Sequence, residues 1–565
     1  VKGLSLRAVG GANILDGQKK EWRRAYGKYG VEGLISTAFG QKSPNSVTQN
    51  NSHRQYLTGQ LIAEYKGVFG KHDINVLGGW SAEENLYEDL QGKRTDIIGN
   101  ELPALNLGDT DGWSNGADEN EWALVSGFMR MNYAFASKYL VEANFRADAS
   151  SRFSKKHRWG VFPSASVGWR ITEEKFMKNQ RIFDNLKLRV SWGQLGNQNG
   201  LGMYDHIASY NIKGYYPFKS ELGQWAVISK LPSETRTWET VEMNNFAVDM
   251  AFLRNRLTVT GEYFIKRNKD MLVNVEVPSV IGVDVPTGNY GELEVKGWEV
   301  TVGWQDRIKD FSYSARFNLS DQKDKLVDYG VEYNGFVAGV NQKVQGYSLG
   351  SIFGYRTDGY FTSEEEVKNS AAYNKSITGV GDIKYVDKDG DGKISAPNDL
   401  EYLGTTTPRY TFGLNLTAAW KGFDLGILFQ GVGKRNFYLS SEVMNPYYAT
   451  WNNFSYKMHN DYWTPENPNA AFPRYYAGAN HNYQISDHWL QNAAYVRLKN
   501  LQLGYTIDPK LTKSWGIQRL RVYFSGDNLC EYSKLNDNFD PELSNVDGYV
   551  YPIMRNFSFG LNVTF

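Results

Sequence analysis

The sequence predicts an all-β protein, a transmembrane antiparallel β-barrel to which this chain contributes about sixteen strands. Three observations predict this fold: apolar and polar residues alternate over many segments, aromatic residues recur near the segment ends, and short connections alternate with long ones. The segment 555–565 shows the alternation most clearly, with Phe557, Phe559 and Leu561 on one side and Asn556 and Ser558 on the other. Because successive side chains point to opposite faces of a strand, this segment has one apolar and one polar face.

The same alternation recurs along the chain, in order, at 125–135, 139–148, 257–266, 311–320 and 410–420. Each segment is near the roughly 9–11 residues that a tilted strand needs to cross a bilayer. Tight polar turns at 70–72, 137–138 and 254–256 predict hairpins, and therefore antiparallel neighbours. We expect the long connections to be extracellular loops, and they lie at 90–120, 197–238, 323–407 and 435–490.

Two other β architectures would also alternate. A large soluble protein, such as a propeller or a stack of sandwiches, is one, but aromatic residues make up 15% of this chain and no repeat recurs at the roughly 40–50 residues of a propeller blade. A barrel of sixteen strands closed on itself, the size of a porin, is the other, and it would require the first strand to pair with the last.

The composition excludes several classes of function. Lys+Arg and Asp+Glu are equal at 62 each, so no charge excess indicates nucleic acid as a partner. No run approaches the ~18 apolar residues of a membrane helix, and the single cysteine, Cys530, cannot form an internal disulfide. The seven histidines form no HExxH motif, and no GxSxG, P-loop or dinucleotide glycine pattern lies between a strand and a helix, so the sequence predicts no enzyme.

Several short sequence motifs, which occur in a fixed order along the chain, resemble those of a known family. They are Phe145–Phe153, Arg158–Ser164, Gly168–Arg170, Trp238–Thr240, Asn255–Thr258, Lys269–Leu272, Asn289–Glu292, Lys296–Glu299, Trp463–Pro468, Phe472–Arg474, Tyr495–Leu501, Gly504–Tyr505 and Ser525–Leu529, followed by the terminal strand. In these motifs the chain resembles the SusC/RagA-type TonB-dependent transporters of the Bacteroidetes outer membrane.

The resemblance implies TonB-dependent nutrient import of glycan or peptide fragments, with a SusD-like surface lipoprotein as a lid. It also implies a barrel of about twenty-two strands with an N-terminal plug and a TonB box, neither of which is recognisable here. We therefore interpret residues 1–565 as one domain, the C-terminal part of the barrel. Its edge strands would pair with the remaining N-terminal part of the barrel, and TonB would act through that missing region. The alternatives are a non-transporting barrel, as in a porin or surface adhesin, and a secreted β-rich glycoside hydrolase.

One short motif predicts a metal site. Three aspartates occupy alternate positions and a glycine follows, as in the calcium loop of an EF-hand, where hard oxygen ligands converge on one cation. At the twelfth position Asn398 stands instead of Glu, and Asp399 could supply the missing carboxylate. We expect a structural Ca²⁺ that stiffens the 323–407 loop; the alternative is an Asx-rich turn without metal. The candidate ligands are Asp387, Asp389, Asp391, Lys393 through its carbonyl, Asn398 and Asp399.

The 435–490 loop is rich in aromatic residues. Aromatic faces stack on sugar rings, and they also pack loops against each other. The first reading predicts contacts with substrate or with a lid, and the second predicts contacts within the loop or with a partner. The candidate contact residues are Tyr447, Tyr448, Trp451, Tyr456 and Trp463.

Overall fold

The computed structural model describes most of the chain. The described residues are 2–25, 29–30, 33–34, 45–99, 101–218, 221–228, 230–274, 278, 280, 282–330, 336–439, 441–447, 456–543, 551 and 553–565. Within them, no helix is both long enough and apolar enough to cross a membrane.

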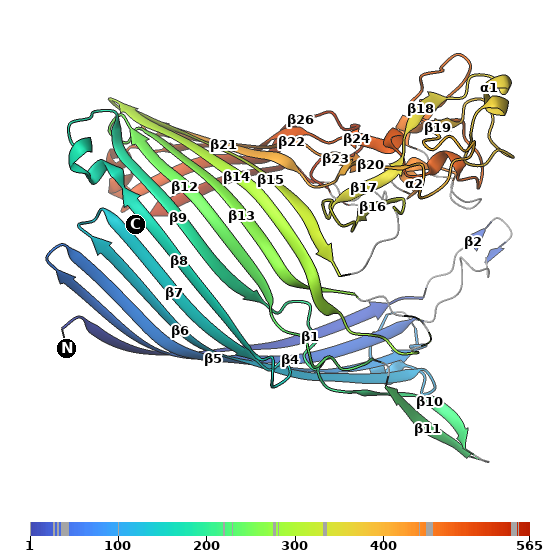
Figure 1. The fold of residues 1–565 in the computed structure, drawn as a ribbon, viewed down its shortest axis with the longest axis horizontal. Coiled ribbons are helices and arrows are strands. Elements are labelled where there is room, and N and C mark those ends of the chain that lie inside the picture. The colour runs from blue at the N-terminus through green and yellow to red at the C-terminus, as the bar shows by residue number, and fades with distance from the viewer. Residues whose placement is uncertain are drawn as a thin grey trace. The chain divides into compact units, whose positions relative to one another are not determined.

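Sixteen strands form one sheet in which strands adjacent in sequence are neighbours, with antiparallel pairs wherever the register is defined. This confirms the predicted fold class and strand number, and Figure 1 shows the strands β5 to β9 side by side. In sheet order the strands are β1 (Leu4–Arg23), β4 (Ser46–Phe69), β5 (His72–Thr95), β6 (Trp113–Phe135), β7 (Tyr139–Ser150), β8 (Trp159–Arg170), β9 (Phe183–Asn197), β12 (Glu239–Phe252), β13 (Leu257–Val273), β14 (Gly288–Ile308), β15 (Phe311–Tyr329), β21 (Arg409–Trp420), β22 (Phe423–Lys434), β25 (Tyr495–Thr506), β26 (Arg519–Ser533) and β27 (Asn556–Thr564).

Many apolar side chains of these strands are exposed rather than packed in a protein core. On β27 the side chains of Phe557 and Phe559 are 62% and 83% exposed, and Trp420 at the end of β21 is 53% exposed. A face of this kind is stable only where it meets a solvent as apolar as itself, which a lipid bilayer provides. The alternating pattern therefore has the orientation that a membrane strand requires.

The turns agree with the predicted hairpins, whereas the long connections differ in extent. β4 and β5 pair from Phe69 and His72 at the turn out to Ser46 and Thr95. β5 continues to Thr95 and β6 begins at Trp113, so much of the expected 90–120 loop is strand. Its residues are mostly polar on both faces, so no apolar alternation marks it, yet backbone pairing continues beyond the alternating part.

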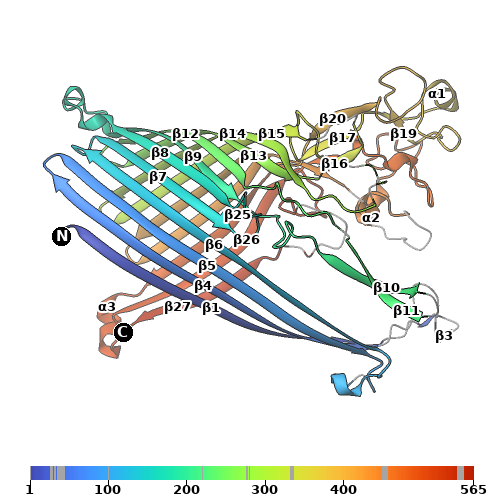
Figure 2. The ribbon, with the colours of Figure 1, turned by 60° about the horizontal axis from the view of Figure 1, so that its bottom comes forward.

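The connection expected at 197–238 contains a separate hairpin, visible in Figure 2. The connections 323–407 and 435–490 also carry short elements of their own, and β15 itself extends to Tyr329. The short strands are β2 (Tyr29–Gly30) with β3 (Gly33–Leu34), β10 (Tyr210–Phe218) with β11 (Glu221–Ile228), β16 (Gly339–Gln342) with β17 (Ser351–Tyr355) and β20 (Leu400–Thr405), β18 (Thr357–Tyr360) with β19 (Ile383–Tyr385), and β23 (Asn436–Tyr438) with β24 (Leu490–Asn492). The helices are α1 (Glu364–Asn369), α2 (Ser441–Met444) and α3 (Pro509–Thr512), with 3-10 turns at Leu105–Leu107, Ile171–Glu173, Lys175–Met177, Lys457–Asn460, His481–Tyr483, Asp487–Trp489 and Lys513–Trp515.

A hydrophobic core lies in the connections. The described residues of 336–405, 435–493 and 534–543, called the loop body below, contribute to one cluster of buried side chains. Backbone bonds join its parts: the Tyr355 N–H donates to the Ile485 carbonyl at 2.8 Å, and the Leu439 N–H donates to the Trp489 carbonyl at 3.3 Å. The buried members are Tyr355, Ile383, Tyr385, Ile394, Leu400, Phe437, Leu439, Val443, Met444, Phe472, Trp489, Ala493 and Leu535.

By its internal contacts the chain divides into two compact units. The first comprises 1–166, 193–240 and 274–289 and holds β1 to β7 and the β10–β11 hairpin. The second comprises 167–192, 241–273 and 290–565 and holds β13, β15, β21, β22, β25 to β27 and the loop body. The two cavities, the predicted metal loop and the buried polar cluster described below belong to the second unit.

Candidate functional site

Polar side chains of neighbouring strands form hydrogen bonds and ion pairs across the sheet. The hydroxyls of Ser314 and Thr417, on the neighbouring strands β15 and β21, lie 2.7 Å apart. On β9, Arg189 donates to Asp249 at 2.7 Å and to Glu262 at 2.8 Å. Such a face offers donors and acceptors to a polar molecule, as expected of the lumen-facing side of a membrane strand.

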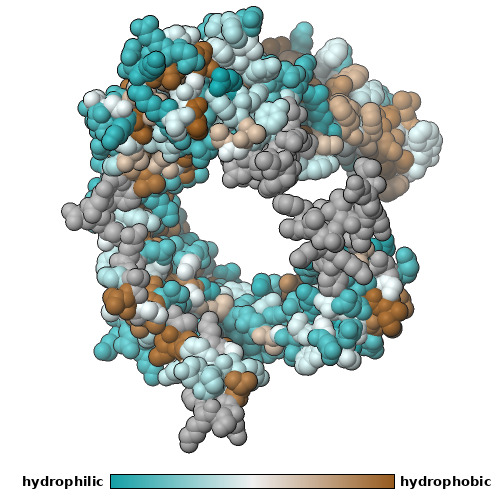
Figure 3. Space-filling model, turned by 90° about the vertical axis from the view of Figure 1, so that its right-hand side faces the viewer, coloured by the Kyte–Doolittle hydropathy of each residue, from teal (hydrophilic) through white to brown (hydrophobic). Residues whose placement is uncertain are grey.

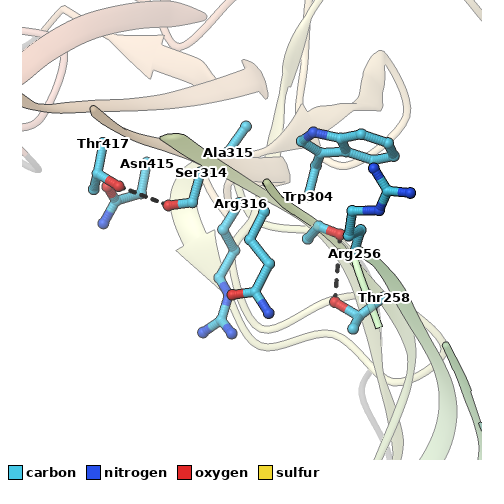
Figure 4. Close-up of a pocket in the computed structure, with 10 residues that line it drawn as sticks. Arg256, Thr258, Trp304, Ser314, Ala315, Arg316, Asn415 and Thr417 are labelled. Atoms are coloured by element: carbon cyan, nitrogen blue, oxygen red, sulfur yellow. Dashed lines mark hydrogen bonds between the residues drawn. The ribbon is translucent and has the colours of Figure 1, made fainter. Parts of the chain in front are cut away.

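A cavity of about 310 Å³ opens on this face, and Figure 4 shows its lining. Ser314 and Thr417 point toward each other, and Arg316 extends from the same strand as Ser314. The Thr258 hydroxyl donates to the Gly303 carbonyl at 3.4 Å. The lining comes from the turn before β13 and from the strands β13, β14, β15 and β21, and comprises Arg256, Thr258, Gly303, Trp304, Gln305, Ser314, Ala315, Arg316, Asn415 and Thr417.

The three aspartates of the predicted metal loop do converge. Carboxylate oxygens of Asp387, Asp389 and Asp391 lie within 4.8 Å of one another. The turn is tight because Gly390 and Gly392 have positive φ, at 75° and 82°, where a glycine is unstrained. Their N–H groups donate to Asp387 at 2.8 Å each, which holds this carboxylate toward the loop interior.

The remaining predicted ligands take different places. The Asn398 amide donates to Asp389 at 2.8 Å, so its side chain reaches the triad. Asp399 is 1% exposed, and its two oxygens accept the backbone N–H groups of Lys388 and Ser395 at 2.8 and 2.7 Å. The Asp399 carboxylate therefore closes the base of the loop by accepting hydrogen bonds from the backbone of the loop.

The triad fits a hard cation. Three carboxylates this close repel one another, and none of them forms an ion pair with Lys or Arg among the described residues. A divalent cation would remove that repulsion, and carboxylate oxygens are the ligands that Ca²⁺ prefers. Lys393 is exposed and occupies the seventh position of the loop, the position that supplies a backbone carbonyl in an EF-hand loop.

The aromatic candidates divide between packing and exposure. Tyr456 packs against the loop-body core, with its ring 6.4 Å from that of Phe539. Trp463 lies flat against Gly381, where an added Cβ would come within 2.3 Å of the indole ring. Tyr447 is exposed and contacts the ring of Tyr475 at 5.4 Å. Tyr448 and Trp451 lie outside the described residues.

In the view of Figure 3, hydrophilic residues cover most of the visible face, and apolar residues form separate patches. The contacts of Tyr456 and Trp463 described above show that both rings pack within the loop body. Contact of Tyr447 with a substrate or lid stays a prediction.

A buried polar cluster in the loop body has no counterpart in the sequence analysis. Asp382 is 0% exposed, and it accepts from Asn482, His481 and Tyr476, each at 2.9 Å, and from the Gly379 N–H at 2.7 Å. Burial, together with the Asp382 charge, raises the pKa of Tyr476 to about 12. The cluster joins two segments about a hundred residues apart, and no motif or periodicity marks such a pairing.

Most of the chain matches one family. The model described as "TonB dependent receptor-like, beta-barrel" matches residues 11–529. The chain belongs to this family. Its members are outer-membrane receptors, so the expected outer-membrane location and the absence of an enzymatic function are confirmed.

Curated relatives carry the same family name. The chain is 29% identical over 544 residues to "TonB-dependent receptor P3" of Formosa agariphila, covering 92% of this chain and 52% of the relative. It is 28% identical over 545 residues to "TonB-dependent receptor SusC" of Bacteroides thetaiotaomicron, covering 92% and 50%. The chain spans about half the length of the curated relatives it matches.

Among solved structures, "Structure of the RagAB peptide transporter" matches with a TM-score of 0.84 at 23% identity, over 100% of this chain and 60% of that chain. This likeness shows the fold, and together with the SusC relative it confirms the SusC/RagA resemblance stated from the sequence.

Proposed function

We propose that this chain forms part of the wall and the outer loops of an importer that takes glycan or peptide fragments across the outer membrane. The observation that carries the proposal is the two-faced sheet, whose apolar face is exposed and whose polar face is lined with hydroxyls, amides and charges. An adhesin needs no such hydrogen-bonding face, whereas an importer needs one along the path of its cargo.

Two partners complete the proposal. A SusD-like lipoprotein serves as the surface lid and TonB supplies the energy, because relatives and fold neighbours include proteins named SusC, RagAB and TonB-dependent receptors.

The sheet order also supports a further partner. β1 and β27 are its two end strands, and an unpaired strand edge in lipid leaves N–H and C=O groups that cost several kcal/mol each. Strands from the rest of a longer barrel are the proposed partners of these edges.

The test of import is uptake by cells that carry the complete gene. Cells should accumulate fluorescent oligosaccharides or oligopeptides from a panel, and the accumulation should stop when either this gene or TonB is inactivated. Uptake that continues without TonB would favour a porin, and binding of cells to a surface without any uptake would favour an adhesin.

We also propose that the loop at 387–399 holds Ca²⁺ in a structural role. The support is the triad of uncompensated carboxylates and the buried Ile394, which anchors the loop in the loop-body core. Asp387, Asp389, Asp391 and the Lys393 carbonyl would hold the ion, with Asn398 beside them.

Calorimetry on the intact transporter tests the calcium proposal. Calcium should bind the wild type, and Asp389→Ala should abolish that binding and speed proteolysis of 386–399. Asp358→Ala, an exposed acidic residue elsewhere in the loop body, is the matched control and should bind calcium normally. Equal binding by Asp389→Ala and the wild type would remove the site from consideration.

A further inference from the structure

Positive charge concentrates on one part of the polar face. Next to the cavity of Figure 4 lies a second cavity of about 700 Å³, and both are lined by Arg256, Gln305, Ser314 and Thr417. Four arginines and two aspartates line the two cavities, which we call the arginine cleft. They are Arg254, Arg256, Arg307 and Arg316, with Asp306 and Asp424.

The two aspartates of the arginine cleft are already neutralised. Asp306 accepts from Arg256 at 2.9 Å, and Asp424 accepts from Arg521 at 2.8 Å. Among the described residues, the guanidinium groups of Arg254 and Arg316 make no hydrogen bond or ion pair. The chain as a whole has equal numbers of acidic and basic residues, so the excess in the arginine cleft is local.

The guanidinium of Arg316 is also left accessible by its neighbours. In the strand register Arg316 lies opposite Gly303 of β14 on one side and Asn415 of β21 on the other. Gly303 has no side chain to cover the guanidinium, so space remains on that side, and this glycine lines the cavity. The hydroxyls of Ser314 and Thr417 line the same cavity as Arg316 and offer further hydrogen-bonding groups.

A guanidinium group presents parallel N–H donors that match the two oxygens of a carboxylate. We propose that the arginine cleft binds carboxylate groups of the transported fragment, with Arg316 as the principal contact. This inference rests on the proposed import function and narrows its cargo to acidic fragments. The carboxylate can belong to a uronic acid of a glycan or to an acidic side chain of a peptide, and the experiment separates these two sources.

The test uses the intact transporter, purified in detergent from the complete gene, and two pairs of probes. One pair is tetragalacturonate and its neutral methyl ester; the other is a tetrapeptide with two aspartates and the same peptide with asparagines. We expect wild type to bind one acidic probe more tightly than its neutral partner. Arg316→Gln should lower the affinity for that acidic probe about tenfold, because a hydrogen bond to a charged group is lost. The affinity for the neutral probe should not change.

Arg130→Gln is the matched control. Arg130 is an exposed strand arginine of β6 whose Nε donates to the neutral Asn144 at 2.9 Å, so its loss removes the same charge outside the arginine cleft. It should leave the binding of all four probes unchanged. The acidic probe should also bind more weakly as salt is raised, since screening acts on the charged contact.

Three outcomes would overturn the inference: wild type binding no acidic probe better than its neutral partner, Arg316→Gln binding all probes like wild type, or Arg316→Gln losing charged and neutral probes equally. The failure of the proposed function is seen separately, in cells. If Arg316→Gln lowers acidic binding in detergent while cells show no TonB-dependent uptake of any probe, the cleft binds carboxylates and the import proposal is wrong.

Discussion

The sheet and the loop body use their apolar residues in opposite ways. In the loop body Trp489 is 1% exposed and lies among buried aromatic and aliphatic side chains. On β27 the side chains of Phe557, Phe559 and Leu561 all stand exposed. One chain therefore contains a core of the kind found in soluble proteins and a sheet whose apolar surface is its outside.

The difference shows that each region is built for its own solvent. In water, burial of apolar area stabilises a fold, at about 25 cal/mol per Å². In lipid that term vanishes for an outward side chain, and the sheet is held instead by its backbone hydrogen bonds, which have no water to replace them. An exposed phenylalanine therefore has a different meaning in the two regions.

The largest expected effect is the removal of a large side chain from the loop-body core. Trp489→Ala should destabilise the loop body by about 3–5 kcal/mol, because it loses transfer energy and leaves a cavity. Pulse proteolysis of the intact transporter in detergent, followed by mass spectrometry of the loop fragments, measures this.

Phe559→Ala is the matched change on the sheet, and it should shift the same measurement by less than about 1 kcal/mol, since no cavity forms at an outward position. Equal losses for the two variants would contradict the comparison.

The second expected effect concerns the buried polar cluster. Asp382→Ala should cost the loop body about 3 kcal/mol, because the buried His481 and Asn482 would each lose a partner, and the half-buried Tyr476 would lose one as well. Hydrogen exchange at 379–385 and 474–483 should accelerate, while the heat-resistant mobility of the sheet on SDS gels should not change.

Asp358→Ala serves as control, because this carboxylate is exposed and pairs with Lys384 at 3.0 Å at the surface. Its effect should stay below about 1 kcal/mol. If both variants behaved alike, the cluster would contribute no more than a surface ion pair.

The two regions also differ in how far the sequence predicts them. Strands such as 410–420 and 555–565 are predicted by the alternation of apolar and polar residues. This pattern is local, so it can be recognised without knowledge of distant residues. The metal loop is equally local, since Asp387 to Asp391 lie within five residues.

The loop body is not local in this sense. Ile383 and Trp489 join one core, and Asp382 meets His481, across about a hundred residues that include the sheet strands β21 and β22. Short elements such as β19 show no period long enough to read. The histidines at 481 and 488 form hydrogen bonds within the loop body, and only tertiary contacts decide their burial, which no local pattern predicts.

The third expected effect tests what exposure means in each region. Leu561→Arg, at an outward position of β27, should destabilise the membrane-inserted sheet by about 2 kcal/mol, since charge at the lipid face is costly. Ile377→Arg, at an exposed position of the loop body, should change stability by less than about 0.5 kcal/mol. Guanidinium titration in vesicles measures the first change and pulse proteolysis the second. A neutral result for Leu561→Arg would mean that this face does not contact lipid.

The smallest expected effect is a dependence of the loop body on pH. Burial lowers the pKa of both His459 and His488. The Tyr456 N–H donates to Nδ1 of His459 at 2.9 Å, and Nε2 of His459 lies 2.8 Å from the Val443 carbonyl, so the neutral ring satisfies both contacts. Nε2 of His488 lies 3.1 Å from the Ala471 carbonyl.

Since both rings are held neutral in the folded loop body, the unfolded chain binds more protons once pH falls below about 6.5, the ordinary pKa of histidine. Stability of the loop body should therefore be full well above that pH and fall as the pH drops through about 6.5 toward the lowered pKa of the folded rings. Pulse proteolysis at a series of pH values measures it. His459→Gln keeps one donor and one acceptor but cannot take up a proton, so it should flatten part of the profile. A variant whose stability falls with pH as steeply as that of the wild type would show that His459 does not carry the effect.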